Sequence, residues 1–359
     1  MALLEFGNKH TFGLDIGSYS VKVVQLRKEK SGYIATSAAQ SVIGPNRDKG
    51  QRKEAGEVLE AIKSGMSISQ IQTKYAVCSV CGPEVFMKGF KFPPLSSEEI
   101  EQAVLLEAEQ SVPFDIEQSI VDYNLLPGSN RSEAIRSEGG RGSDLQGIIV
   151  AASKTLIRER KQLAKKSSLS CALVDIDGLA LLNCFLETEP LAGDQTVVIL
   201  NVGRSYTNLI FVRKGVPPFL RDLPHAGGGI IRELVRDLDE PSETIDELLF
   251  TQETSNHEDN SIAANLSKAS QKLISDITET MRYYNIQHKI KSVDRVLLCG
   301  GFSLARGFDR VLDSHLTAEV ELWDPFTRIR WGKATIGQEL LKHSGPAFAV
   351  AAGLAMRTL

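Results

Sequence analysis

The stretch Leu14-Asp15-Ile16-Gly17-Ser18-Tyr19-Ser20 lies near the start of the chain, and a related stretch, Leu200-Asn201-Val202-Gly203-Arg204-Ser205-Tyr206-Thr207, lies near its middle. In both, an apolar run ends in a glycine turn with hydroxyl side chains, between β-type residues. A third apolar run, Val296 to Cys299, leads into Gly300-Gly301. Repetition of one such unit indicates two related halves that begin with the same hairpin.

These hairpins have the residue types that bind a polyphosphate. Glycine lets backbone N–H groups approach phosphate oxygens, and Asp15 can hold Mg²⁺ through water. Taken alone, Gly17 could serve a plain turn that Asp15 caps, and Arg204 could be a solvated surface residue. The repeat favours a nucleotide site. Its candidate residues are Asp15, Gly17, Ser18, Tyr19, Ser20 and Lys22 in the first hairpin, and Asn201, Gly203, Arg204, Ser205, Tyr206 and Thr207 in the second.

Two further glycine-rich elements extend the candidate site. Gly227-Gly228-Gly229 precedes a predicted helix, 230–238, and its N-terminus suits an anion or a ribose, although flexible entry into the helix explains the glycines as well. Gly300-Gly301-Phe302 follows a predicted buried strand and would let adenosine lie against the backbone, although a plain turn is an equal alternative. From these elements, Gly227, Gly228, Gly300, Gly301 and Phe302 join the candidate nucleotide-binding residues.

Length and composition indicate a globular protein of more than one lobe. The chain has 359 residues, of which 42% are apolar and 24% charged. Its formal net charge of −4 gives no reason to expect nucleic acid as a partner. We see no secretory signal in residues 1–9, and the apolar run 347–356 is shorter than the roughly 18 residues that span a bilayer. We therefore expect a cytoplasmic protein that reaches a membrane only through a partner.

Five cysteines at irregular positions suit a reducing compartment better than a disulfide framework. Cys78 and Cys81 form a CxxC pair. A redox or zinc role is open, but the surrounding AVCSVCG and the lack of a second pair favour a buried strand.

The periodicity of the first half predicts a strand meander and a separate small unit. The meander covers 11–26 and 32–41. A helix is predicted over 95–110, capped by Ser96 or Ser97 and ended by Pro113. Strands follow at 120–126 and 147–152, and we expect a mobile hairpin loop over 127–146 between them.

Further elements are predicted in the second half. A basic helix covers 154–166, and an apolar helix over 172–185 is expected between the lobes. A strand, turn and strand cover 196–212. Helices follow over 241–285, broken by the polar run 251–260, and a buried strand covers 293–298. A last helix covers 346–356.

The order of two phosphate hairpins and a Gly-Gly turn resembles the actin, Hsp70 and sugar-kinase superfamily over nearly the whole chain. The segment 173–180 looks like its first inter-lobe connecting helix and 347–355 like its second. The resemblance implies an α/β protein with an actin-like/Hsp70 ATPase (ribonuclease H-like) fold, whose two lobes flank a nucleotide cleft. We expect a first lobe of 1–84 with 153–180 and 335–359, an inserted subdomain at 85–152, and a second lobe of 181–334 with a helical subdomain at about 227–290.

Within that superfamily the chain is similar to the PilM family of type IV pilus assembly, which is related to FtsA. The similar segments are 106–115 (LEAEQSVPFD), 121–126 (VDYNLL), 215–224, Arg282-Tyr283-Tyr284 and Asp324-Pro325-Phe326. The resemblance implies binding of ATP with Mg²⁺, and a scaffold role at the inner membrane. It also implies capture of the cytoplasmic N-terminal peptide of PilN beside the inserted subdomain, with pilus motor ATPases as further candidate partners.

Two positions depart from the family pattern. Asn201 stands where a second Asp is usual, so we expect weak or no ATPase activity. Leu249 stands where a Lys is usual, so contacts to the base and ribose should differ. The alternative is an ATP-hydrolysing or filament-forming actin-like protein similar to FtsA. No signature of a sugar kinase's catalytic Asp is visible.

Overall fold

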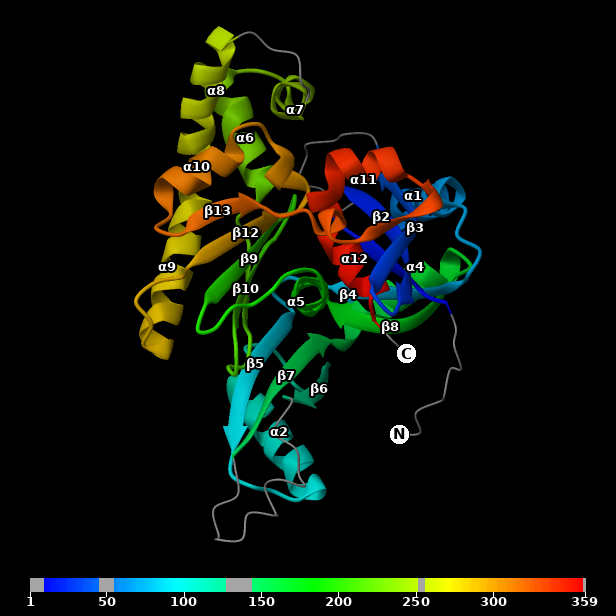
Figure 1. Ribbon diagram of the computed structural model, residues 1–359, viewed down its shortest axis with the longest axis vertical. Coiled ribbons are helices and arrows are strands. Elements are labelled where there is room, and N and C mark those ends of the chain that lie inside the picture. The colour runs from blue at the N-terminus through cyan, green and yellow to red at the C-terminus, as the bar shows by residue number, and fades with distance from the viewer. Residues whose placement is uncertain (1–9, 45–54, 127–143, 251–255, 358–359) are drawn as a thin grey trace.

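Two lobes, each built on a central sheet, lie side by side, and a third, smaller sheet extends below them (Figure 1). This computed structural model describes residues 10–44, 55–126, 144–250 and 256–357. Within these ranges, no helix is both long and apolar enough to cross a bilayer.

The sheet of the first lobe has the order β14-β3-β2-β1-β4-β8. The predicted meander is confirmed, because β1, β2 and β3 pair antiparallel, whereas β4 and β8 continue the sheet in parallel. Helices α1 (Ala55–Ser69) and α4 (Lys154–Lys166) pack against this sheet. The strands are β1 (Phe12–Ile16), β2 (Ser20–Glu29), β3 (Gly32–Val42), β4 (Tyr75–Val80), β8 (Ser170–Ile176) and β14 (Arg330–Ile336).

The sheet of the second lobe repeats this topology in the order β11-β10-β9-β12-β13. Strands β9, β10 and β11 form an antiparallel meander, and β12 and β13 follow in parallel, as β4 and β8 do in the first lobe. The internal repeat inferred from the two hairpins is therefore present in the fold. The strands are β9 (Thr196–Val202), β10 (Thr207–Arg213), β11 (Phe219–Leu223), β12 (Arg295–Cys299) and β13 (Glu319–Leu322).

Helices build the outer part of the second lobe and share one apolar core with its sheet. Tyr284 of the Arg282-Tyr283-Tyr284 motif lies in that core, and its ring stacks on Phe211 with the centroids 4.3 Å apart. The helices are α6 (Gly227–Leu238), α7 (Ser242–Phe250), α8 (Asn256–Ala269), α9 (Gln271–His288) and α10 (Phe308–His315).

The inserted subdomain is a three-stranded antiparallel sheet with one helix on it. Strands β5 (Val85–Phe92), β7 (Leu145–Ser153) and β6 (Ser119–Leu125) lie in that order, and α2 (Ser97–Ser111) packs on them over a small core. Ser96 and Glu99 form the expected capping box at the start of α2. Most of the loop predicted as mobile, residues 127–143, lies outside the described residues, and β7 already begins at Leu145.

Two helices lie in the core between the lobes and pack on each other: α5 (Asp177–Thr188), which connects β8 to β9, and α12 (Ala349–Ala355), which follows a 3₁₀ turn at Gly345–Phe348. Contact is close at Gly353, where a Cβ atom would come within 1.8 Å of the Ala180 carbonyl oxygen. The prediction of a helix over 172–185 was wrong at its start, because residues 170–176 form β8. A short apolar run fits a buried strand or a buried helix equally well by periodicity.

Three other boundaries also differ from the predictions. The expected end of the second lobe at residue 334 falls inside β14, which pairs with β3, so residues 330–336 belong to the first lobe's sheet. Residues 256–260 of the predicted polar break are helical in α8, and 251–255 lie outside the described residues. The three glycines 227–229 form the first turn of α6 rather than preceding it.

Candidate functional site

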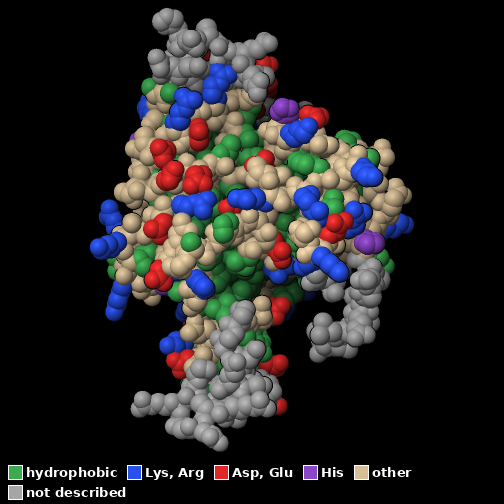
Figure 2. Space-filling model, viewed as in Figure 1, with side chains coloured by type: hydrophobic (Ala, Val, Ile, Leu, Met, Phe, Trp, Pro, Cys, Tyr) green, Lys and Arg blue, Asp and Glu red, His purple; other side chains and the backbone are tan. Residues whose placement is uncertain are grey.

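A cleft of about 1470 Å³ lies between the lobes and is lined by residues of both. This exceeds the roughly 300–1,000 Å³ usual for a small-molecule site, so the cleft has room for a nucleotide. In Figure 2, acidic and basic side chains are interspersed over the visible face.

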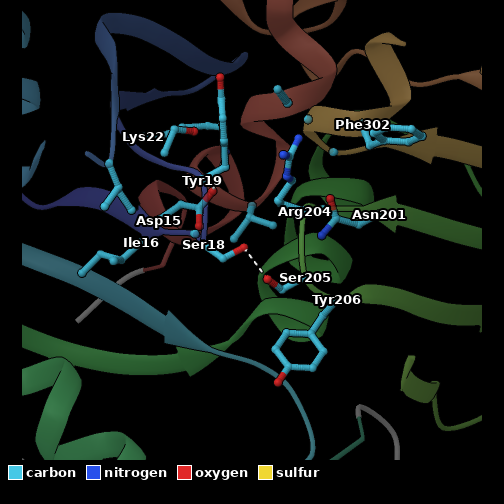
Figure 3. A pocket seen from close by; sticks show the side chains of 18 of the residues that line it. Asp15, Ile16, Ser18, Tyr19, Lys22, Asn201, Arg204, Ser205, Tyr206 and Phe302 are labelled. Carbon is cyan, nitrogen blue, oxygen red and sulfur yellow. Dashed lines mark hydrogen bonds and ion pairs between the residues drawn. The ribbon is translucent and has the colours of Figure 1, made fainter. Parts of the chain in front are cut away.

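The two hairpins meet in this cleft (Figure 3). Their turns have the same hydrogen bond, from Gly17 N to Ser20 O at 3.1 Å and from Gly203 N to Tyr206 O at 3.0 Å. Ser205 Oγ donates to Ser18 Oγ at 2.8 Å and joins the turns. The hairpins therefore face each other, as the repeat indicated.

Asp15 and Lys22 form a buried ion pair at the base of the first hairpin. They are opposite each other in the register of β1 and β2, and Lys22 Nζ lies 3.3 Å from Asp15 Oδ2. No group of three or more His, Cys, Asp or Glu residues within the described ranges could hold a metal. The Asp15 carboxylate fits Mg²⁺ that is held chiefly by phosphate oxygens and water, as Mg²⁺ prefers.

Arg204 is directed across the cleft. Its Nη1 lies 3.3 Å from Asp246 Oδ1 on α7, and its guanidinium lies 5.5 Å from the centre of the Tyr19 ring in the first hairpin. Burial raises the pKa of Tyr19, Asp246 adds to this rise, and Arg204 opposes it. Arg204 therefore joins three parts of the cleft, and the alternative of a solvated surface arginine was wrong.

The glycines at the start of α6 do not line the cleft, contrary to the prediction of an anion or ribose site. Gly227 N donates to Gly203 O at 3.0 Å and Gly228 N to Arg204 O at 2.8 Å, so both donors already bind the second hairpin. A Cβ atom on Gly228 would lie 2.7 Å from Arg204 O. Both glycines support the hairpin from behind.

The Gly300-Gly301 turn forms part of the cleft wall. Gly300 has φ +94°, and a Cβ atom there would come within 2.5 Å of Asn201 Oδ1 and of Val202 O. Gly301 faces open space, and a Cβ atom there would meet nothing within 4 Å. Phe302 is buried and packs against Phe250 of α7 and Phe308 of α10. An adenosine could therefore lie over Gly301 and next to α7.

Thr207, like the two α6 glycines, lies behind the cleft rather than in its lining. It is fully buried, and its Oγ1 donates to His225 O at 2.8 Å. The predicted residues that line the cleft are Asp15, Gly17, Ser18, Tyr19, Ser20, Lys22, Asn201, Gly203, Arg204, Ser205, Tyr206, Gly300, Gly301 and Phe302.

Asp177 is a cleft residue that the sequence interpretation missed. It is the first residue of α5, at the carboxyl end of β8. Burial, followed by the charge of Asp15, raises the pKa of its carboxyl group to about 6, against the hydrogen bonds from Ser79 and Cys81. The Asp-Gly pair after an apolar run was the available signal, because ligands bind beyond the carboxyl ends of parallel strands.

Asn201 belongs to a chain of hydrogen bonds that reaches the other lobe. Its Nδ2 donates to Asn208 Oδ1 at 2.6 Å, and Asn208 Nδ2 donates to Asp222 Oδ1 at 2.7 Å. Asp222 Oδ2 accepts from Gly82 N, 2.7 Å away in the first lobe. Burial raises the pKa of Asp222, and the two hydrogen bonds oppose that rise. An amide side chain at position 201 can donate a hydrogen bond to Asn208, whereas an ionised carboxylate at that position could not.

The two cysteines of the CxxC pair lie in and directly after a buried strand. Cys78 is buried in β4, as expected, and Cys81 follows this strand. Burial raises the pKa of the Cys81 thiol well above its usual value. A hydrogen bond with Cys171, followed by burial, does the same to the pKa of Cys78. Both thiols are therefore poor nucleophiles.

Comparison with known proteins identifies the family. The family model "Type IV pilus assembly protein PilM" matches residues 13–359. Among solved structures, a "PilM-PilN type IV pilus biogenesis complex" is 23% identical, with a TM-score of 0.78 over 98% of this chain and 99% of that one. The ethanolamine utilization protein EutJ from Carboxydothermus hydrogenoformans is 11% identical, with a TM-score of 0.55 over 98% and 90% of the two chains.

A diol dehydratase-reactivating factor in nucleotide-free form is 11% identical, with a TM-score of 0.51 over 96% of this chain and 98% of that one. These structural likenesses show the fold and confirm the predicted actin-like α/β class. The match of the family model covers nearly the whole chain. This protein belongs to the PilM family of type IV pilus assembly proteins.

Proposed function

We propose that this protein is a cytoplasmic, ATP-binding scaffold of the type IV pilus inner-membrane assembly complex, and that it captures the cytoplasmic N-terminal peptide of PilN. The observation that carries the proposal is the pair of matching hairpins that meet at Ser18 and Ser205 in a cleft between two lobes. Family membership and the similarity to a PilM-PilN complex support the role in assembly.

The cleft residues divide into a phosphate end and an adenosine end. Ser18, Ser205 and the backbone of both turns offer donors to phosphate, and Arg204 can exchange Asp246 for a phosphate oxygen. Asp15 would hold water bound to Mg²⁺, while Gly301 leaves space for the adenosine. When bound, ATP and Mg²⁺ would make charged contacts with residues of both lobes at once.

The inserted subdomain contacts both lobes, which would allow the nucleotide to affect a partner site beside it. Gly89 of β5 packs so closely on Pro217 of the second lobe that a Cβ atom would lie 2.7 Å from Pro217 Cβ. Met87 and Ile148 of the same subdomain belong to the apolar core between the lobes. A change in the angle between the lobes would therefore move the subdomain and change its affinity for a peptide.

We expect slow hydrolysis or none, because Asn201 holds a structural hydrogen bond where the family resemblance implies a carboxylate. Asp177 favours a second candidate function, ATP hydrolysis. Its carboxyl group lines the cleft, and a pKa of about 6 suits a proton acceptor near neutral pH. Phosphate release that falls in Asp177→Asn while ATP affinity persists would support this second function.

The partner site can be tested by replacing residues 85–152 with a short linker. Val85 and Ala152 are paired across β5 and β7, and Ser153 N donates to Glu84 O at 3.1 Å, so a short linker can join the ends. The second lobe should stay folded because it has a core of its own. We expect a labelled N-terminal PilN peptide to lose its binding in fluorescence anisotropy. Binding at wild-type affinity would place the recruiting surface elsewhere.

A further inference from the structure

Helix α2 carries an exposed apolar and acidic surface, here called the α2 ridge, which consists of Glu98, Glu101, Leu105, Leu106 and Glu109. Leu105 and Leu106 are 52% and 57% exposed, although the opposite side of the helix packs on the small sheet. The three glutamates are exposed, and none of them has an ion pair with any residue that the structure describes.

The other glutamates of α2 have local roles, which distinguishes them from the ridge. Glu99 completes the capping box with Ser96, and Glu107 is paired with Lys88 at 2.6 Å. Helix stability therefore accounts for Glu99 and Glu107. It does not account for two adjacent leucines that face water between carboxylates.

A second exposed feature lies on the second lobe, between α9 and the end of α10. It is a groove of about 530 Å³, here called the α9 groove. Ile286 at its edge is 72% exposed. Among the described residues, its lining contains basic and apolar side chains and no Asp or Glu. The lining residues are Thr278, Met281, Arg282, Asn285, Ile286, Lys289, Ile290, Lys291, His315, Leu316 and Thr317.

The groove contains three cations, Arg282, Lys289 and Lys291. Like the ridge glutamates, they form no ion pair with any residue in the described part of the chain. Lys289 caps the C-terminus of α9, where a cation complements the helix carbonyl groups. That effect falls off within the last turn, so it does not explain Arg282, six residues before His288. Arg282 belongs to the motif Arg282-Tyr283-Tyr284, whose Tyr284 lies in the core.

We propose that the α2 ridge of one copy of this protein docks into the α9 groove of a second copy. The three ridge carboxylates would face the three groove cations, and Leu105 and Leu106 would cover the apolar side chains around Ile286. With a net charge of −4, the whole molecule would repel nucleic acid or an anionic bilayer, whereas a local acidic helix matches a local basic groove.

The placement of the two surfaces makes the contact intermolecular. Helix α2 lies on the inserted subdomain, and α9 lies on the outer side of the second lobe (Figure 1). Each copy therefore offers one ridge and one groove, and the same contact can close a dimer or continue a chain of copies. This inference is independent of nucleotide and of PilN.

One helix in one groove makes a small contact, below the roughly 1,200 Å² of a stable interface. We therefore expect association that rises with protein concentration and weakens with salt, because exposed charge pairs are screened beyond about 10 Å at 0.1 M. Sedimentation velocity of the full chain at low salt, over a series of concentrations, measures this directly.

Two double variants test the contributions of the ridge and the groove separately. Glu101→Lys with Glu109→Lys changes the ridge and keeps the groove, whereas Arg282→Glu with Lys291→Glu changes the groove and keeps the ridge. All four positions are exposed, so unchanged thermal melting should show that both variants fold. Glu60→Lys with Glu339→Lys, also exposed, makes the same net charge change as the ridge variant and serves as its control.

We expect the wild type and the control to associate, each surface variant alone to stay monomeric, and a one-to-one mixture of the two surface variants to associate again. Recovery in the mixture arises because one variant supplies an intact groove and the other an intact ridge. A wild type that is monomeric at every concentration would overturn the proposal. Association of both surface variants at wild-type strength, or its loss in the control, would also overturn it.

Discussion

The hydroxyl of Ser205 lies 2.8 Å from the hydroxyl of Ser18 and donates a hydrogen bond to it, although the residues belong to different lobes. It is a direct link between the two hairpins, at the place where phosphate groups would enter. A bound polyphosphate would replace this hydrogen bond by contacts to both turns.

Removal of the hydroxyls of Ser18 and Ser205 should lower the affinity for ATP more than it lowers the stability of the folded protein. Each hydrogen bond makes a net contribution of about 0.5–1.5 kcal/mol, so the double variant Ser18→Ala, Ser205→Ala should lower the affinity for ATP roughly fivefold to a hundredfold. Calorimetric titration with Mg²⁺-ATP measures this loss. Unchanged affinity in a folded double variant would remove these hydroxyls from the site.

Asp15→Asn should reduce Mg²⁺-dependent binding, because it keeps the shape of the side chain and removes its charge. We expect a loss of about 1.5–3 kcal/mol, or tenfold to a hundredfold in affinity. Lys22 would lose its partner at 3.3 Å, so the melting temperature should also fall. The titration is therefore done below the variant's melting transition, and an affinity independent of both Mg²⁺ and this substitution would contradict the assigned role.

Gly300 and Gly301 form a matched pair, since one is required by the fold and the other faces the cleft. Gly300→Ala should destabilise the protein, because its positive φ and contacts at 2.5 Å leave no space for a Cβ atom. Gly301→Ala should melt like the wild type but bind ATP more weakly. Thermal melting and ATP titration of both variants test this contrast, and normal ATP affinity in Gly301→Ala would move the adenosine elsewhere.

Asp177 should make stability depend on pH in the acid range. Its pKa rises from 3.8 to about 6 on folding, so the folded state holds the proton more tightly and stability falls as pH rises from about 4 to above 6. At about 1.4 kcal/mol per pH unit, the loss is at most about 3 kcal/mol. Asp177→Asn should therefore match the wild type near pH 4 and exceed it at pH 7 in denaturant unfolding. Equal stability of the two proteins at pH 7 would contradict this.

Asp222→Ala should weaken the contact between the two lobes, because it removes the carboxylate that accepts hydrogen bonds from both Gly82 and Asn208. Leaving buried donors unpaired costs about 1–3 kcal/mol. We expect a lower melting temperature and faster limited proteolysis between the lobes. As a control, Glu29→Ala removes a partly exposed carboxylate that is paired with Arg27 and Arg330 within the first lobe, and it should change neither measurement.

Local patterns predicted the hairpins, the meander and the α2 cap, because turn glycines, alternation and capping residues act over a few positions. They misplaced the start of α5, since the apolar run before Asp177 fits a strand or a helix. They also assigned Gly227 and Gly228 to a ligand, although these N–H groups bind Gly203 and Arg204. Such long-range hydrogen bonds, like the link from Asn201 to Gly82, depend on how the lobes pack and have no local signal.

The most direct test of the proposed scaffold is fluorescence anisotropy of a labelled N-terminal PilN peptide, titrated with the wild-type protein with and without Mg²⁺-ATP. We expect saturable binding whose affinity changes when ATP is present, and loss of this change in Asp15→Asn. Absence of peptide binding in both conditions would contradict the proposed function, and equal affinity in both would contradict its control by nucleotide.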